Sequence, residues 1–293
     1  MKIWIALIFF ASKSAFCQVL DNRLGEAFTD KPFFNEAFVK QNKLKTLVGS
    51  YVYKRTGEAM MTTKYKYVYN FDEEGHLAST YETKLDDGTK DTIWNIYEYD
   101  PKHLLITHRK TDLDGYTTVH YAYDNKGRVI GEEYMRDIDS AGQIVRSLSF
   151  NKERITYGDY GTQTKKTRFN NYDLPYLDEF VRYDSLGYLI ERVERIKMTS
   201  TTYTYTYSYN AQGKLAAVRK SSNLQEGYME EFLFRYDELG NLMEKHIYKD
   251  GVFTTDVQII YNSKTKLLAT VITKQVSTGF LMILRFQDYD FYN

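Results

Sequence analysis

A short tyrosine-rich signal that returns along the chain constrains its fold more than any other feature. Residues 202–209 alternate strictly between small polar residues and tyrosines, a period of two that is typical of a β-strand with its aromatic side chains on one face. The strand runs directly into the turn sequence Asn210-Ala-Gln-Gly213, which is followed by Leu215. This segment therefore predicts the first strand and the turn of a β-hairpin.

The same unit recurs through most of the chain. In its stronger copies an aromatic residue precedes an Asp or Asn. A Gly follows three positions after that Asp or Asn, and a Leu or Val follows five positions after it. The copies follow one another at about 26 residues, with a few shorter and longer intervals, as the units of a repeat protein do. The Asp or Asn of each copy is Asp72, Asp100, Asp124, Asp139, Asn170, Asp184, Asn210, Asp237 or Asn262.

The turn in this unit also predicts how the strands pair. Asp-x-x-Gly is typical of a type I turn with a Gly bulge. This turn places the residue just before the Asp opposite the residue five positions after the Asp. Cross-strand apolar pairs contribute only about 0.2–1 kcal/mol each, so several hairpins must stack to bury a shared face. The predicted pairs are Phe71–Leu77, Tyr99–Leu105, Tyr123–Val129, Ile138–Ile144, Tyr183–Leu189, Tyr209–Leu215, Tyr236–Leu242 and Tyr261–Leu267.

The residue after this apolar position is apolar too in most copies, as at Ile106 and Ile190. In a regular strand its side chain points to the opposite face, so both faces are covered near the turns. We therefore expect a strongly curled sheet. The spacing is disturbed in residues 147–177, and we interpret that stretch as a bend or as an inserted functional surface.

The units YAYDNKGRV (121–129), VRYDSLGYL (181–189), YSYNAQGKL (207–215) and FRYDELGNL (234–242) resemble the tyrosine–aspartate (YD) repeats of Rhs-type proteins. The resemblance covers roughly residues 60–270. It implies a β-hairpin sheet that winds into shells or strips, some of which enclose toxins and some of which are described as carbohydrate-binding. About eight units are few for a closed shell, and no long toxin module follows them, so the resemblance implies a short, stand-alone exported member.

We expect an all-β fold, an antiparallel β-hairpin repeat array that forms a curled, elongated sheet with one short N-terminal helix. Asp30 as N-cap and Pro32 in the first turn predict that helix over residues 31–41. The predicted organisation is a signal peptide (1–17), an N-terminal helical cap (18–42) and a YD-repeat-like β domain (43–293).

The signal peptide is predicted from Lys2, the apolar run 3–11 and small residues before a cleavage site at Gln18. A buried strand and a lipid-bearing Cys17 are the alternatives. Cleavage removes the single cysteine, and with it thiol chemistry and disulfides. The sequence thus predicts an exported protein that is periplasmic, outer-membrane-associated or extracellular, with no transmembrane segment in the mature chain.

The charge balance narrows the class of partner. The chain has 39 basic and 39 acidic residues, and the predicted signal peptide removes two lysines and no acid. A slightly acidic mature chain argues against nucleic acid and anionic membrane surfaces as partners. The expected partner is an envelope or extracellular protein or a glycan.

Motifs for catalysis or metal binding are not found in the sequence. His76 and His103 fall in predicted turns, where solvated side chains are expected, while His108 and His120 could face one another from adjacent strands. No helical zinc motif, nucleophile motif or phosphate-binding Gly loop occurs. We expect no enzyme activity, no cofactor and no metal; a glycan hydrolase with a carboxylate pair is the remaining catalytic alternative.

The expected function is therefore an exported binding or interaction scaffold of the cell envelope. The tyrosines suggest an alternative, a carbohydrate-binding module, because a phenol ring can stack on a sugar and adds a hydroxyl group. The tyrosines farthest from the turns are the candidate ligand-binding residues: Tyr65, Tyr67, Tyr203 and Tyr205.

Overall fold

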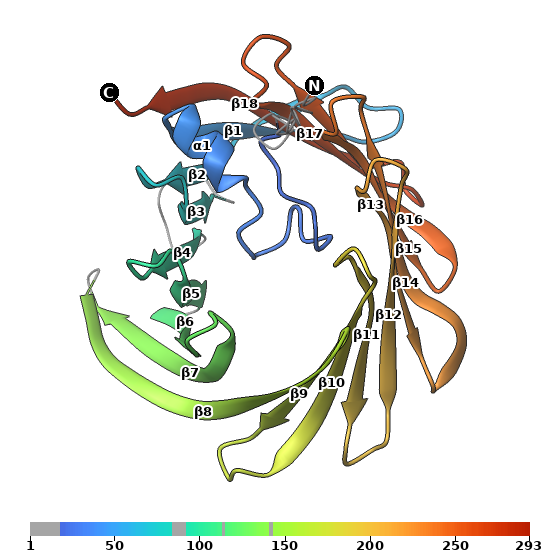
Figure 1. Cartoon of the computed structure of the whole chain (residues 1–293). Coiled ribbons are helices and arrows are strands. Elements are labelled where there is room, and N and C mark those ends of the chain that lie inside the picture. Colours follow the sequence, from blue (N-terminus) through green and yellow to red (C-terminus); the bar gives the residue numbers. More distant parts are fainter. Residues whose placement is uncertain (1–17, 84–91, 113–114, 141–142) are drawn as a thin grey trace, which may run out of the picture.

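A computed structural model describes residues 18–83, 92–112, 115–140 and 143–293 (Figure 1). The predicted signal peptide lies outside the described residues. The described chain forms one short helix and a run of strands, namely α1 (Glu36–Gln41), β1 (Leu44–Lys54), β2 (Met61–Phe71), β3 (Leu77–Glu82), β4 (Ile93–Tyr99), β5 (Leu105–Asp112), β6 (Gly115–Tyr123), β7 (Val129–Ser140), β8 (Gln143–Tyr160), β9 (Gln163–Phe169), β10 (Pro175–Tyr183), β11 (Leu189–Ile196), β12 (Thr202–Tyr209), β13 (Leu215–Ser222), β14 (Gln225–Tyr236), β15 (Leu242–Lys249), β16 (Val252–Tyr261), β17 (Leu268–Gln275) and β18 (Leu281–Phe291).

The sheet closes on itself into an 18-stranded barrel. Each strand pairs antiparallel with the next one along the chain, and β18 pairs with β1 over nearly the whole of both strands. The prediction of an all-β array of antiparallel hairpins is thus confirmed, and closure into a barrel is more specific than the curled sheet that the sequence predicted. The repeats form the hairpins from β2 to β17, with β7 and β10 each shared by two repeats, and β1 and β18 complete the ring that Figure 1 shows.

The register predicted from the turn is confirmed in six of the eight hairpins, as in Tyr123 opposite Val129. The Gly127 backbone N–H donates to the Asp124 carbonyl at 3.1 Å, and the Arg128 N–H donates to Asp124 Oδ1 at 2.9 Å. Gly127 has φ +74°, as the bulge requires. In the copies without Gly, His103 and Lys266 adopt the same left-handed conformation.

The two wrong pairs come from turns of a different length. Tyr261 lies opposite Leu268 rather than Leu267, because the turn after Asn262 is one residue longer. In the β7–β8 hairpin, Ile144 lies opposite Asp139 rather than Ile138. The strands there extend to Ser140 and Gln143, so pairing continues closer to the tip than an Asp-x-x-Gly turn allows.

The second apolar residue after each turn is the extra residue of the bulge. Glu98 pairs with Thr107 and Tyr99 pairs with Leu105, so Ile106 has no partner of its own in the ladder. It lies beside Tyr121 and Tyr123 on the inner side of the wall. The expectation that this residue points to the opposite face was therefore wrong, since the bulge interrupts the alternation and keeps both apolar side chains on one side.

The disturbed stretch 147–177 contains the longest strand. β8 has 18 residues and follows the curve of the barrel wall (Figure 1). β9 pairs only with the last seven residues of β8, from Arg154 onward. The first part of β8 is therefore hydrogen-bonded to β7 alone. The stretch is thus a change in strand length within the wall, which includes the bend that the spacing suggested.

The segment before β1 enters the barrel. Its backbone runs through the ring, next to β2–β4 on one side and β13–β16 on the other, before it reaches helix α1, which lies at the rim beside β1 and β2 (Figure 1). The Tyr97 hydroxyl donates to the Asp30 carbonyl at 2.6 Å, and Asn22 donates to the Tyr236 hydroxyl at 3.0 Å. Strand residues that alternate in register with Tyr97 and Tyr236 therefore face the interior. The intervening residues of each strand face outward.

Helix α1 is shorter than predicted. It begins at Glu36 with Asn35 as N-cap, whose side chain accepts from the Phe38 N–H. The predicted N-cap at Asp30 was wrong. Residues 31–35 are not helical, and this segment places the Phe33 and Phe34 rings in the core. Both rings pack against Tyr69, at centroid distances of 5.9 and 4.9 Å.

The outward face of the wall carries cross-strand ion pairs, and the hydrophobic core of aromatic and aliphatic side chains lies in the interior. Arg182 pairs with Glu191 at 3.0 Å and Arg219 pairs with Glu231 at 2.5 Å, each between neighbouring strands. Among the described residues, no helix has the length and apolar character needed to span a bilayer.

Gly75 tests how tightly α1 is seated on the barrel. A Cβ at Gly75 would lie 2.3 Å from the Glu36 carbonyl oxygen, whereas one at Gly57 would meet nothing within 4 Å. Both residues have positive φ, so Gly57→Ala measures the backbone cost alone, about 1–2 kcal/mol. We expect Gly75→Ala to lower the free energy of unfolding, measured in urea, by about 2 kcal/mol more than Gly57→Ala does. Equal losses would show that α1 is not packed on this turn.

Candidate functional site

A cavity of about 340 Å³ lies inside the barrel, between the N-terminal segment and the wall. Ligand-binding cavities are commonly of this size and are lined mainly by apolar and aromatic side chains. Here Phe28 and Phe33 form the side contributed by the N-terminal segment. The wall contributes Tyr51, Tyr67, Tyr69, Ile247, Val257, Val271, Met282 and Leu284, with Thr255 and Thr273 among them.

One cation, Lys245 of β15, lines this cavity without an acidic partner. Its side chain is buried, with 6% of the residue exposed, and its Nζ donates to the Ala27 carbonyl at 3.0 Å. No described carboxylate forms an ion pair with it. Burial lowers the pKa of Lys245 to about 8, with no nearby acid to offset the loss of hydration. The ammonium group thus remains mostly charged at pH 7 in apolar surroundings.

Two other polar side chains that line the cavity already have partners. Asp30 forms an ion pair with Lys110. The Tyr51 hydroxyl donates to Glu82 Oε1 at 3.0 Å, and burial raises the pKa of Tyr51 and Tyr69, so both stay neutral. Lys245 is therefore the single uncompensated charge among the described residues that line the cavity.

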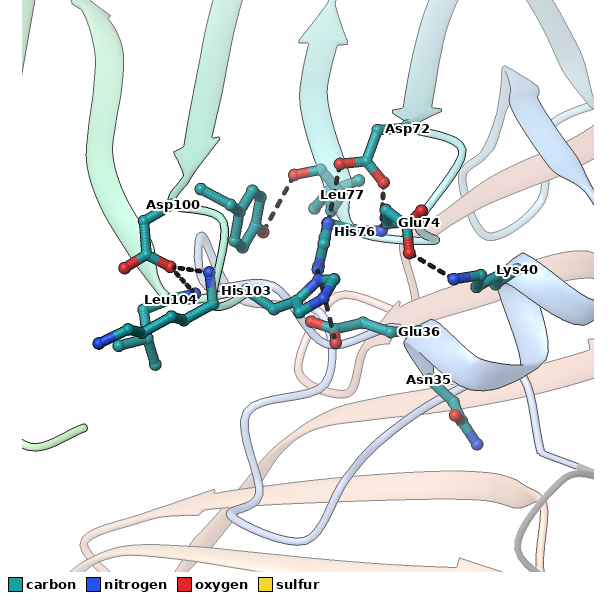
Figure 2. Close-up of polar contacts among 12 residues, drawn as sticks. Asn35, Glu36, Lys40, Asp72, Glu74, His76, Leu77, Asp100, His103 and Leu104 are labelled. Atoms are coloured by element: carbon teal, nitrogen blue, oxygen red, sulfur yellow. Dashed lines mark hydrogen bonds and ion pairs between the residues drawn. The ribbon is translucent and has the colours of Figure 1, made fainter. Parts of the chain in front are cut away.

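A second cluster lies where α1 meets the turns after β2 and β4 (Figure 2). Asp72 Oδ2 lies 2.8 Å from His76 Nδ1, and His76 Nε2 lies 2.9 Å from His103 Nδ1. With Asp72 ionised, His76 donates to it and can accept from His103. Glu36 of α1 lies 4.0 Å from His76; burial raises the pKa of Glu36, and the two histidines partly oppose that effect.

This relay connects helix α1 to the turns of the barrel wall. His76 is only 3% exposed, and its ring stacks on Tyr99 at 4.4 Å. No described Ser, Thr or Cys side chain is hydrogen-bonded to His76 or His103, so the relay lacks a nucleophile to activate. The expectation of a solvated His76 was wrong, because α1 covers the turn that carries it.

His108 and His120 do not form a site together. His108 faces the interior, where it lies 3.1 Å from Asn95 Oδ1, whereas His120 is on the outward side, 3.2 Å from the Thr107 hydroxyl. Their strands are adjacent, but His108 is paired with Val119 in the ladder. The described residues contain no group of three or more His, Cys, Asp or Glu residues placed to hold a metal ion.

A network of charged residues lines the interior on β7–β9. Glu132 and Glu153 lie opposite one another in the ladder, and both contact Arg168 Nη1, at 3.0 and 2.8 Å. The Tyr134 hydroxyl donates to Glu132 at 2.6 Å. Burial would raise the pKa of Glu132, but the hydrogen bonds from Arg168 and Tyr134 hold it below its usual value.

Glu132 and Glu153 are two acids that the structure brings together on neighbouring strands, as the glycan-hydrolase alternative requires of its carboxylate pair. In that chemistry one carboxyl group must be protonated to act as general acid. Here the guanidinium of Arg168 lies between the two carboxylates and favours ionised Glu132. Both carboxylates are therefore ion-paired with the same guanidinium in this structure.

The four candidate tyrosines fall into two separate pairs on different parts of the ring (Figure 1). Tyr67 lines the cavity, and Tyr65 packs against the core beside Tyr53, with ring centroids 6.3 Å apart. Tyr203 and Tyr205 are half-buried on the inner face of β12, where Lys220 Nζ lies 5.1 and 5.6 Å from their ring centroids. The structure brings only Tyr67 to the cavity.

The sequence reasoning missed Lys245, Phe28 and Phe33. The signal for Lys245 was present, since it lies two residues before Ile247 and shares the inward phase of that apolar residue. A lysine in the inward phase of a strand is uncommon unless it is paired or functional. Phe28 and Phe33 gave no such signal, because the path of an irregular segment cannot be read from periodicity.

No family model matches the sequence, and no curated protein matches it. The YD-repeat resemblance therefore stays a prediction. Among solved structures, a porin-like protein from Bacteroides uniformis aligns with 83% of this chain and 97% of its own, at 11% identity and a TM-score of 0.39. A TcdB2–TccC3 complex aligns with 77% of this chain and 15% of its own, at 11% identity and a TM-score of 0.24.

A LolA superfamily protein from Nitrosomonas europaea aligns with 87% of this chain and 91% of its own, at 9% identity and a TM-score of 0.18. At these identities and TM-scores, the three proteins share only a loose similarity of fold with this chain.

Proposed function

We propose that this chain is an exported, non-enzymatic binding protein of the cell envelope that takes a small, largely apolar ligand into its barrel. The observation that supports this proposal is the interior cavity, lined by aromatic and aliphatic side chains from both the wall and the N-terminal segment. The charged outward face is compatible with an aqueous compartment, since barrels that span membranes present an apolar band to lipid.

The cavity accounts for binding better than the two alternatives of a sugar-binding face and a carboxylate hydrolase. Lys220 lies over Tyr203 and Tyr205, and Arg192 lies 4.0 Å from the Tyr205 ring centroid, so cations already occupy these faces. Arg168 likewise forms ion pairs with both members of the carboxylate pair. The cavity, in contrast, is lined by a cation without an acidic partner, Lys245, in apolar surroundings.

The test is binding of N-phenyl-1-naphthylamine, a neutral probe that becomes fluorescent in apolar sites, to residues 18–293. Val257→Phe and Thr255→Phe each place a ring in the cavity and are expected to abolish the fluorescence increase. Ile260→Phe is the matched control, because it lies on the same strand but faces outward and is 45% exposed. Binding that all three variants retain would contradict the proposed site.

A further inference from the structure

The arrangement around Lys245 suggests the chemical class of the ligand, and this inference rests on the proposed function. An ammonium group has three N–H donors, and Lys245 uses one of them for the Ala27 carbonyl. No hydrogen-bond acceptor or carboxylate among the described residues takes the other two. The Phe232 ring, whose centroid is 5.5 Å from Nζ, adds a weak cation–π contact but accepts no charge-assisted hydrogen bond.

A buried cation without a counter-ion is uncommon because burial of a charge is unfavourable unless it is paired. The nearest acid on the N-terminal segment that lines the cavity, Asp30, is held by Lys110 on β5. The described chain thus supplies every other charge at this cavity with a partner and leaves Lys245 without one. An anion that enters the cavity would complete the pair in a low-dielectric site, where charge-assisted bonds are strongest.

We propose that the ligand is an amphiphile with a carboxylate head group and a single apolar chain, of the fatty-acid class. The carboxylate accepts the two free N–H groups of Lys245, which keeps its bond to Ala27. The apolar chain occupies the space beside Val257, Val271 and Leu284, which removes apolar surface from water. A carboxylate fits better than a neutral head group because only an anion compensates the ammonium charge.

The experiment compares dodecanoate with 1-dodecanol as competitors of N-phenyl-1-naphthylamine at pH 7, below the concentration at which either aggregates. The wild-type protein is expected to bind dodecanoate about tenfold or more tightly than the alcohol, the size of one to two charge-assisted hydrogen bonds. Lys245→Met and Lys245→Gln are expected to lose this preference and to bind the two compounds with equal affinity.

Lys249→Met is the matched control, since Lys249 lies on the same strand but does not line the cavity and is exposed. It is expected to keep the full preference for the acid. Equal affinity of the wild type for acid and alcohol would overturn the carboxylate assignment and leave the cavity proposal standing. A preference that survives in both Lys245 variants would also overturn it. Failure of the wild type to bind the probe would overturn both proposals.

Discussion

Arg168→Met is expected to lower the free energy of unfolding by about 3–5 kcal/mol at pH 7. The substitution leaves Glu132 and Glu153 opposite one another inside the barrel without their shared counter-charge. Removal of one partner from a buried ion pair costs more than the pair contributes, because the remaining charge stays in a low-dielectric site. Chemical unfolding monitored by circular dichroism measures the change.

The pH dependence of this loss identifies its cause. The pKa of Glu132 is lowered in the wild type, so the stability that Arg168 provides is present at neutral pH and is lost as the pH falls below the ordinary glutamate value of 4.5. The difference between wild type and variant should therefore shrink in acid. Arg182→Met, which breaks an exposed pair with Glu191, is the control and should change stability by less than about 1 kcal/mol. A pH-independent loss would contradict the electrostatic explanation.

Lys245→Met is expected to have the opposite effect and to raise the free energy of unfolding of the ligand-free protein by about 2 kcal/mol at pH 7. Burial lowers the pKa of Lys245 from 10.5 to about 8, so the unfolded chain binds a proton more readily than the folded one. The wild type should therefore gain stability as the pH rises from 8 to 10.5, where the unfolded state still carries the proton. The variant should lack this gain.

Lys249→Met, on the exposed end of the same strand, is the control for this experiment and should leave stability nearly unchanged. A Lys245→Met protein that is less stable than the wild type at every pH would mean that the bond to Ala27, rather than the buried charge, dominates at this position. A stabilising substitution at a lining residue is the usual sign that the native side chain serves function at a cost in stability.

The sequence was sufficient to predict the hairpins because their information is local. The turn at Asp124–Gly127 sets the pairing of Tyr123 with Val129 through a few adjacent residues, and the same chemistry recurs in five other units. The predicted pairing was wrong where the turn had another length. After Asn262 the turn is one residue longer, and Lys266 rather than a Gly has the positive φ. These errors are shifts in register, not errors in the kind of structure.

Closure of the barrel and the contents of its interior depend on contacts between distant parts of the chain. The pairing of β1 with β18 joins residues more than 200 positions apart, and no local pattern predicts it. The burial of His76 depends on where α1 settles, and the cavity depends on the path of an irregular segment through the ring. Lys245 could have been identified from its inward phase, but only the structure shows that no acid accompanies it.

The measurement that tests the central claim most directly is the pKa of Lys245, followed by NMR in protein with ¹³C-labelled lysine side chains. The Lys245→Met variant assigns the signal. Without ligand, the account predicts a pKa of about 8, the value that burial without a counter-ion produces. With dodecanoate bound, it predicts a rise toward or above the usual lysine value, because the carboxylate then stabilises the charged form. A pKa that is normal without ligand, or unchanged when dodecanoate is added, would contradict it.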